Sequence, residues 1–360
     1  MSYIKWLIAT FSLILIFAIL IILVNLWDDS YGVRLILFSK KNEITQTYYQ
    51  NGLNQRMLNA EIVFRSPQKF DSFLFGSSRV GVIDVSGIKR GRFYNMSYSR
   101  GLPAEHLAII KAFLKKRVEI KNVVIGLDDF CFNLSATENK NELSNIMHPD
   151  ANGPNRVSIF AMYFFRNPRL SKLEWWFNRT FKGRIKEELV INNNGLNLSW
   201  REKEKLFYAT GKPIFQDDVR KYEPVKYDPR QVQEAFAAIG ELIKLSQKHN
   251  FSLIFFISPL YETLYLINAQ AMMDVKKRLA QMTDYYDFSG FNSVTTNAVN
   301  YYETSHYRYL VGDMIIKNLY DGGINVPDDF GVLVTRKNIN QHIQKQEFEL
   351  EKYKSEYSLK

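Results

Sequence analysis

Residues 70–80 read FDSFLFGSSRV, a short apolar run that ends at Gly76, Ser77 and Ser78. Near-continuous apolar runs bounded by turn residues are typical of strands buried in a parallel sheet. We therefore expect a strand over 70–75 with a tight turn directly after it. A serine at the carboxyl end of such a strand lies where open α/β sheets place reactive groups.

Four further segments repeat this pattern. We predict strands at 93–98, 123–127, 252–258 and 285–288. Stretches with helical period lie between several of them, for example AEHLAIIKAFLKKR and VQEAFAAIGELIKLSQKH. This alternation predicts a mostly parallel sheet with helices on both faces, which is a three-layer α/β/α domain.

The residues from Trp6 to Trp27 carry no charged side chain. As a helix, this run spans about 33 Å at about 1.5 Å per residue, which is enough to cross a bilayer core. It ends without a small-residue cleavage site, so we expect a single retained transmembrane anchor rather than a cleaved signal peptide. The nearby Lys and Arg residues do not decide its orientation.

These patterns divide the chain into an anchor at 4–27, a juxtamembrane connector at 28–60 and an α/β domain at 61–325. The domain contains a loop-rich insertion at about 133–230, whose Phe and Trp residues favour a packed core. Stacking on sugars and contact with a bilayer surface are the alternatives for these aromatic residues. The tail at 326–360 is polar, with interleaved Lys and Glu, and we expect a solvated helix or disorder there.

The composition argues against several classes of protein. There are 47 Lys and Arg against 37 Asp and Glu, but this net charge of +10 is spread along the chain, which disfavours nucleic-acid binding. A single cysteine, Cys131, excludes an intrachain disulfide and a Cys-rich metal site. Four side chains are of kinds that can bind a metal, namely Asp128, Asp129, Glu303 and His306, but no motif ties them together. We therefore expect neither a metal nor another cofactor.

A serine hydroxyl is a weak nucleophile unless a base lies within hydrogen-bond reach. We single out His306 as the base because Glu303 lies three residues before it in YYETSHYRYLVGD. On a loop or a helical turn, this spacing lets a carboxylate orient an imidazole, as a catalytic triad requires. Each motif alone also fits a turn serine and a surface histidine.

Taken in order, these segments resemble the SGNH or GDSL-like hydrolase superfamily, over about residues 70–320. Ser78 in Gly-Ser-Ser stands at the nucleophile position, with Ser77 in place of the usual aspartate. In YNMSYSRG, Ser97 stands where the superfamily has its oxyanion-hole glycine, and in VVIGLDDF, Asp128 replaces the customary asparagine. Glu303 and His306 stand in place of the D-x-x-H block.

The resemblance implies an SGNH-like, flavodoxin-like fold and a serine acyl-esterase or O-acyltransferase. Ser78 would attack an acyl donor, His306 would remove its proton and Glu303 would orient the imidazole. Backbone N–H groups of Ser78 and Ser97 would stabilise the oxyanion, with Gly76 and Asp128 beside them. Because an ionised Asp128 cannot donate a hydrogen bond, the alternative is a catalytically degenerate scaffold that binds a glycan or a membrane acyltransferase.

An amino-terminal anchor before a domain with a Gly-Ser-Ser block resembles the DltD-like proteins and the alginate O-acetylation proteins. This resemblance implies a cytoplasmic amino terminus, a periplasmic or otherwise extracytoplasmic domain at the cytoplasmic (inner) membrane, an envelope polysaccharide as acyl acceptor and a multi-spanning membrane acyltransferase as partner. Arg79, Arg100 and Arg308 flank the site blocks and are candidates for binding an anionic glycan or acyl carrier, with a solvated basic surface as the alternative.

Overall fold

The structure is a computed structural model. It describes residues 3–29, 31–33, 36, 48–49, 53–135, 143–168, 170–182, 188–189, 191–215 and 224–356. The connector expected at 28–60 and the insertion expected at about 133–230 therefore lie partly outside the described residues. The chain forms two compact units, one from 1–65 with 139–190 and the other from 66–138 with 191–360.

The second unit is built on a six-stranded sheet with the order β10-β7-β6-β4-β2-β3. The five predicted strands are confirmed and run parallel; they are β2 (Ser72–Phe75), β3 (Phe93–Asn95), β4 (Asn122–Leu127), β6 (Ser252–Ile257) and β7 (Tyr285–Asp287). A sixth strand, β10 (Val332–Val334), pairs antiparallel with β7. In chain order, the parallel strands lie second, first, third, fourth and fifth across the sheet. This is the flavodoxin-like order, whose direction reverses between β2 and β4.

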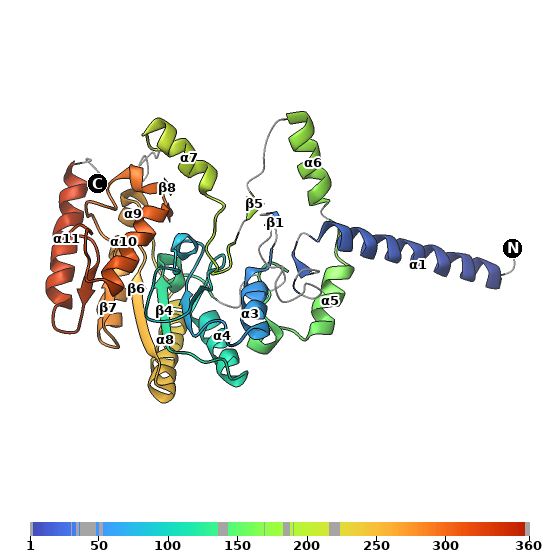
Figure 1. Ribbon diagram of the computed structural model, residues 1–360, viewed down its shortest axis with the longest axis horizontal. Helices are drawn as coiled ribbons and strands as arrows, with labels where there is room; N and C mark the ends of the chain where they lie inside the picture. The colour runs from blue at the N-terminus through green and yellow to red at the C-terminus, as the bar shows by residue number, and fades with distance from the viewer. Residues whose placement is uncertain are drawn as a thin grey trace. The chain divides into compact units, whose positions relative to one another are not determined.

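Helices cover both faces of this sheet (Figure 1). On one face, Phe73 of β2 packs against Phe113 of α4 (Pro103–Lys115), with ring centroids 4.9 Å apart. On the other face, Leu74 shares a buried core cluster with Val311 of α10 (Tyr309–Tyr320). Successive strand residues point to opposite faces, so this alternation places helices above and below the sheet. The α/β class and the mostly parallel sheet are as predicted.

The remaining helices of this unit are α7 (Arg201–Thr210), α8 (Pro229–His249), α9 (Glu262–Ala280) and α11 (Ile339–Glu356), with short 3₁₀ turns at η1 (Val80–Val82), η2 (Asp129–Phe132) and η4 (Ala298–Asn300). The tail contains β10 and α11, and α11 packs on α9 instead of being fully solvated. Its residues Ile339, Ile343, Leu350 and Tyr353 are buried. These apolar residues recur at helical spacing among charged residues, so the hydropathy averaged over the whole segment is polar although one face of the helix is apolar.

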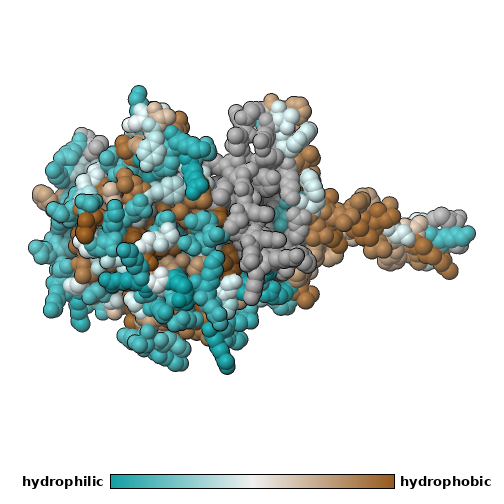
Figure 2. All heavy atoms as spheres, viewed as in Figure 1, coloured by the Kyte–Doolittle hydropathy of each residue, from teal (hydrophilic) through white to brown (hydrophobic). Residues whose placement is uncertain are grey.

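The first unit contains α1 (Tyr3–Asp28), α3 (Gln55–Arg65), η3 (Pro149–Ala151), α5 (Arg156–Phe164) and α6 (Ser171–Lys182), and a pair of short strands, β1 (Tyr48–Tyr49) and β5 (Glu188–Leu189). With 26 residues, α1 is long and apolar enough to cross a membrane. Figure 2 shows its apolar surface exposed along the length of the helix. The chain therefore carries one amino-terminal candidate span within its described residues.

Candidate active site

Ser78 lies on a tight turn at the carboxyl end of β2. From Phe70 to Ile83 every residue is buried except Ser78, which is partly exposed. The Ser77 side chain is turned inward, where its hydroxyl accepts a hydrogen bond from the Arg79 N–H at 3.1 Å. The turn therefore presents one hydroxyl of the Gly-Ser-Ser block to solvent and uses the other to hold its own shape.

The glycine before the two serines is required by close packing. A Cβ atom on Gly76 would lie 2.8 Å from both Val80 methyl groups and 3.2 Å from the Gly126 carbonyl oxygen of β4. Gly76 also has a φ of +155°, which is unfavourable for other residues. Gly76 thus lets the turn pass close to the neighbouring strand, which is a structural role beside Ser78.

The proposed base and its carboxylate lie on a small hairpin. Strand β8 (Tyr301–Glu303) pairs antiparallel with β9 (His306–Tyr307), so Glu303 and His306 face each other across the turn. We expected a loop or a helical turn here. The hairpin forms because Tyr301, Tyr302 and Tyr307 bury their rings, and aromatic residues favour strands.

The hairpin fixes the orientation of the imidazole. His306 Nδ1 is hydrogen-bonded to Glu303 Oε1, and the Ser305 hydroxyl donates to the same carboxylate oxygen at 2.7 Å. Burial opposes ionisation of Glu303, but the hydrogen bonds from His306 and Ser305 outweigh it and lower the pKa of this carboxyl to about 2. An ionised Glu303 holds the proton on Nδ1 and leaves the lone pair of Nε2 free to accept.

The other nitrogen of this imidazole reaches the turn that carries Ser78. His306 Nε2 lies 2.9 Å from Ser78 Oγ, although the two residues are 228 positions apart in the chain. Serine, histidine and carboxylate thus form a continuous hydrogen-bonded chain. In this arrangement the imidazole can take the hydroxyl proton as Ser78 attacks an electrophile, and the carboxylate stabilises the resulting imidazolium.

One of the two expected oxyanion donors already has a partner inside the protein. The Ser97 N–H donates to Asn95 Oδ1 at 3.0 Å, so it is already engaged. The Asn95 amide in turn donates to the Val80 and Ile83 carbonyl oxygens, at 2.7 and 3.1 Å. Ser97 and the buried Asn95 therefore tie the end of β3 to the segment after Ser78, and the backbone donor role expected of Ser97 is not supported.

Asp128 is directed to an arginine. Arg79 Nη1 lies 3.2 Å from Asp128 Oδ1 and 2.5 Å from Asp129 Oδ1, and only the second contact has hydrogen-bond geometry. Burial opposes the charge on Arg79, but the two carboxylates raise its pKa above the usual value. Arg79 is 5% exposed, so it offsets part of the negative charge of these two carboxylates and does not fit the glycan-binding role considered for it.

Arg308 also has a partner inside the protein. Its guanidinium makes two hydrogen bonds to the Glu204 carboxylate of α7, at 3.0 and 2.6 Å, and is 2% exposed. The Tyr302 hydroxyl donates to the same carboxylate at 2.6 Å. Arg308 therefore fastens α7 to the hairpin, and the substrate-binding role considered for it does not fit its burial. Of the three arginines considered, Arg100 alone is exposed.

Trp200, which precedes α7, is a site residue that the sequence did not indicate. Its ring stacks on Tyr302 with centroids 4.7 Å apart and lies 5.3 Å from the His306 ring. Trp200 and Glu204 both come from the segment expected to be a loop-rich insertion. They are about a hundred positions from the hairpin, and no motif spacing links them to it.

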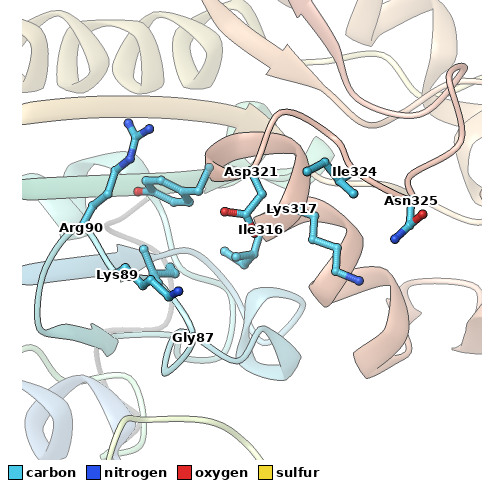
Figure 3. A pocket seen from close by; sticks show the side chains of 10 residues that line it. Gly87, Lys89, Arg90, Ile316, Lys317, Asp321, Ile324 and Asn325 are labelled. Atoms are coloured by element: carbon cyan, nitrogen blue, oxygen red, sulfur yellow. The ribbon is translucent and has the colours of Figure 1, made fainter.

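A pocket of about 510 Å³ lies elsewhere in this unit, between residues 87–90 and the end of α10. Figure 3 shows Lys89, Arg90 and Lys317 around it, together with Asp321. Residues 87–90 lead into the amino-terminal end of β3, whereas Ser78 follows the carboxyl end of β2. The pocket therefore lies at the amino-terminal ends of the strands, opposite Ser78, and takes no part in the serine site.

The four candidate metal ligands form two separate groups. Asp128 and Asp129 face Arg79, whereas Glu303 and His306 face each other beside Ser78. No cluster that could hold a metal ion is found among the described residues.

No protein-family model and no curated protein matches this chain.

Proposed function

We propose that this chain is a membrane-anchored, SGNH-like acyl-esterase or O-acyltransferase that acts on an envelope glycan. The observation that carries the proposal is the 2.9 Å contact between Ser78 Oγ and His306 Nε2, with Glu303 on the other ring nitrogen. The fold brings Ser78 to this hairpin from 228 positions away, and the order of nucleophile, base and orienting carboxylate is the one that activates a serine hydroxyl.

In this mechanism, Ser78 Oγ attacks the carbonyl carbon of an acyl donor while its proton passes to His306 Nε2. Collapse of the tetrahedral intermediate expels the donor's leaving group, which takes that proton, and leaves an acyl ester on Ser78. A glycan hydroxyl or a water molecule then loses its proton to His306, attacks the ester and restores the free serine. Transferase and esterase differ only in this acceptor.

Two features of the fold support the SGNH-like part of the proposal. The nucleophile follows the first parallel strand and lies beside the point where the strand order reverses, the usual ligand site of such sheets. The third block, at the end of β4, adjoins it through Arg79. We propose a backbone donor at Ser78 for the oxyanion, without the one expected from Ser97.

The compartment is part of the same proposal. The candidate span α1 precedes the catalytic unit. We propose a cytoplasmic amino terminus and a periplasmic or otherwise extracytoplasmic catalytic unit, where envelope glycans are found. A multi-spanning membrane acyltransferase would then supply the acyl group.

The test is covalent labelling of the full-length chain by a serine-directed fluorophosphonate. We expect the wild type to label and Ser78→Ala to lose the label. Ser86→Ala, at an exposed serine of the following segment, should label like the wild type. Equal labelling of wild type and Ser78→Ala would remove Ser78 as the nucleophile and with it the proposed reaction.

A degenerate scaffold that binds a glycan or a membrane acyltransferase is the second candidate. It is favoured by Asp128, which replaces an amide donor by a carboxylate paired with Arg79, and by the engaged Ser97 N–H. Complementation in the host separates the two functions. A scaffold tolerates Ser78→Ala and His306→Ala, whereas an enzyme loses function with either.

A further inference from the structure

We propose that α5 and α6 of the first unit form a second membrane contact, lying flat in the interface where α1 leaves the bilayer. Their exposed apolar side chains would contact lipid at the boundary between headgroups and acyl chains. The inference concerns how the protein sits on the membrane and does not depend on the reaction proposed for Ser78.

The carboxyl end of α5 is fastened to the end of α1. Asn25, a polar residue within the apolar helix, donates from its side-chain amide to the Phe164 and Arg166 carbonyl oxygens, both at 3.0 Å. The Tyr163 hydroxyl donates back to the Asn25 carbonyl oxygen at 2.5 Å. Asn25 is 5% exposed. The side chain of Asn25 on α1 thus satisfies the last carbonyl group of α5 and one in the turn that follows it.

This attachment sets the depth of α5. Asn25 is two residues before Trp27, which ends the uncharged run, so the two differ by about 3 Å along the helix axis. Tryptophan at the end of a spanning helix is typical of the membrane–water interface. If α1 spans the bilayer, α5 lies at the level of that interface. Figure 1 shows α5 and α6 running across the direction of α1, as helices in the membrane plane would.

Both helices expose apolar side chains on one face. On α5, Val157, Ala161 and the following Phe165 are one turn apart and exposed, while Ile159 and Tyr163 are buried on the other side. On α6, Leu173, Trp176, Phe177 and Phe181 are 47–65% exposed and recur at helical spacing. The core expected for the insertion aromatics is therefore wrong for these residues. The apolar surface continues from α1 onto the unit around its base (Figure 2).

The composition of this region fits a lipid surface better than a protein partner. Residues 166–182 contain five Lys or Arg residues and a single acidic residue, Glu174. Apolar aromatic residues combined with basic residues on an amphipathic helix are typical of segments that lie in an anionic membrane interface. Continuity with α1 supplies the contact with the bilayer that such a segment needs.

Site-directed spin labelling of the full-length chain tests the proposal. The native cysteine, which is buried, is first removed by Cys131→Ala. Single cysteines for labelling are then introduced into this background by Val157→Cys, Phe165→Cys and Phe181→Cys. The matched control is Tyr208→Cys on α7, since Tyr208 and Val157 are both 76% exposed. Each protein is reconstituted in nanodiscs of phosphatidylcholine with phosphatidylglycerol, and collisions with oxygen and with a water-soluble nickel chelate are measured.

The three labels on and beside α5 and α6 should collide with the nickel chelate several-fold less often than the label at position 208, and more often with oxygen. Chelate collisions equal to those of the control would show that the surface faces water, which overturns the proposal. Labels shielded from both reagents would show that protein covers the face, which also overturns it in favour of a protein partner or a second copy.

Discussion

Two histidine–carboxylate pairs of the second unit show what separates the candidate active site from a structural contact. His306 and Glu303 meet on the β8–β9 hairpin, where their side chains are 22% and 39% exposed. His342 Nε2 lies 2.8 Å from Asp287 Oδ2 between α11 and β7, where the carboxylate is fully buried. The two pairs use the same groups at hydrogen-bond distance.

Their remaining contacts differ. Asp287 also receives the Lys276 ammonium at 2.9 Å, the Gln346 amide at 3.1 Å and the Ser289 hydroxyl at 2.7 Å. Burial opposes its ionisation, but Lys276 and His342 hold the pKa of Asp287 far below its usual range. Its partners are internal groups that hold α9, β7 and α11 together. At His306, the second ring nitrogen meets a partly exposed hydroxyl, so this pair has a group to act on.

The largest expected effect separates the two histidines. His306→Ala should slow fluorophosphonate labelling by about 1,000-fold or more, because removing one member of a catalytic triad disables the unit. His342→Ala should leave the labelling rate unchanged and lower the melting temperature, since it removes a partner from the buried Asp287. Labelling rates and thermal unfolding of both variants check this, and equal rates in the two would remove the distinction.

The second prediction concerns the buried pair alone. Lys276→Met leaves the Asp287 charge without its ammonium partner, so we expect a loss of about 3–5 kcal/mol in the free energy of unfolding. The matched control is Lys277→Met at the half-exposed neighbour, with a change within about 0.5 kcal/mol. Denaturant unfolding in detergent measures both. A loss below about 1 kcal/mol for Lys276→Met would show that the carboxylate is satisfied without the lysine.

The same comparison shows how much of the fold and of the candidate site could be predicted from the sequence. Buried apolar runs such as 70–75 give a strong local signal, so the five parallel strands and the two motifs carrying Ser78 and His306 were predictable. The contacts of Asn95, Trp200 and Glu204 depend on the packing of segments far apart in the chain. Nor could the arginines be sorted from sequence, since it is the packing of distant segments that buries Arg79 and Arg308 and leaves Arg100 exposed.

Glu303→Gln should have a smaller effect than loss of His306. A neutral amide still contacts the imidazole but no longer stabilises the imidazolium, so we expect a loss of labelling rate roughly 10- to 100-fold smaller than the loss in His306→Ala. The pKa of Glu303 is lowered from 4.5 to about 2. Its ionised form therefore stabilises the fold fully above about pH 4.5, and this contribution disappears as the pH falls towards 2.

The pH signature separates a charge effect from a misplaced side chain. The difference in melting temperature between wild type and Glu303→Gln should be constant above about pH 5 and shrink as the pH falls below 4. Thermal unfolding across this range measures it. A difference that does not change with pH would show that the wild-type carboxylate gains nothing from ionisation in this site.

The smallest expected effect lies in the ring that packs against His306, the proposed base. Trp200 contacts both Tyr302 and His306, and aromatic pairs of this kind contribute about 0.5–1.5 kcal/mol. Trp200→Leu should therefore slow labelling by roughly tenfold or less, whereas Trp200→Phe, which keeps a ring, should stay closer to the wild type. If Trp200 positions the imidazole, the loss in Trp200→Leu appears in the rate with little change in melting temperature. A fall in melting temperature with an unchanged rate would instead make Trp200 a packing residue, as the partners of His342 are.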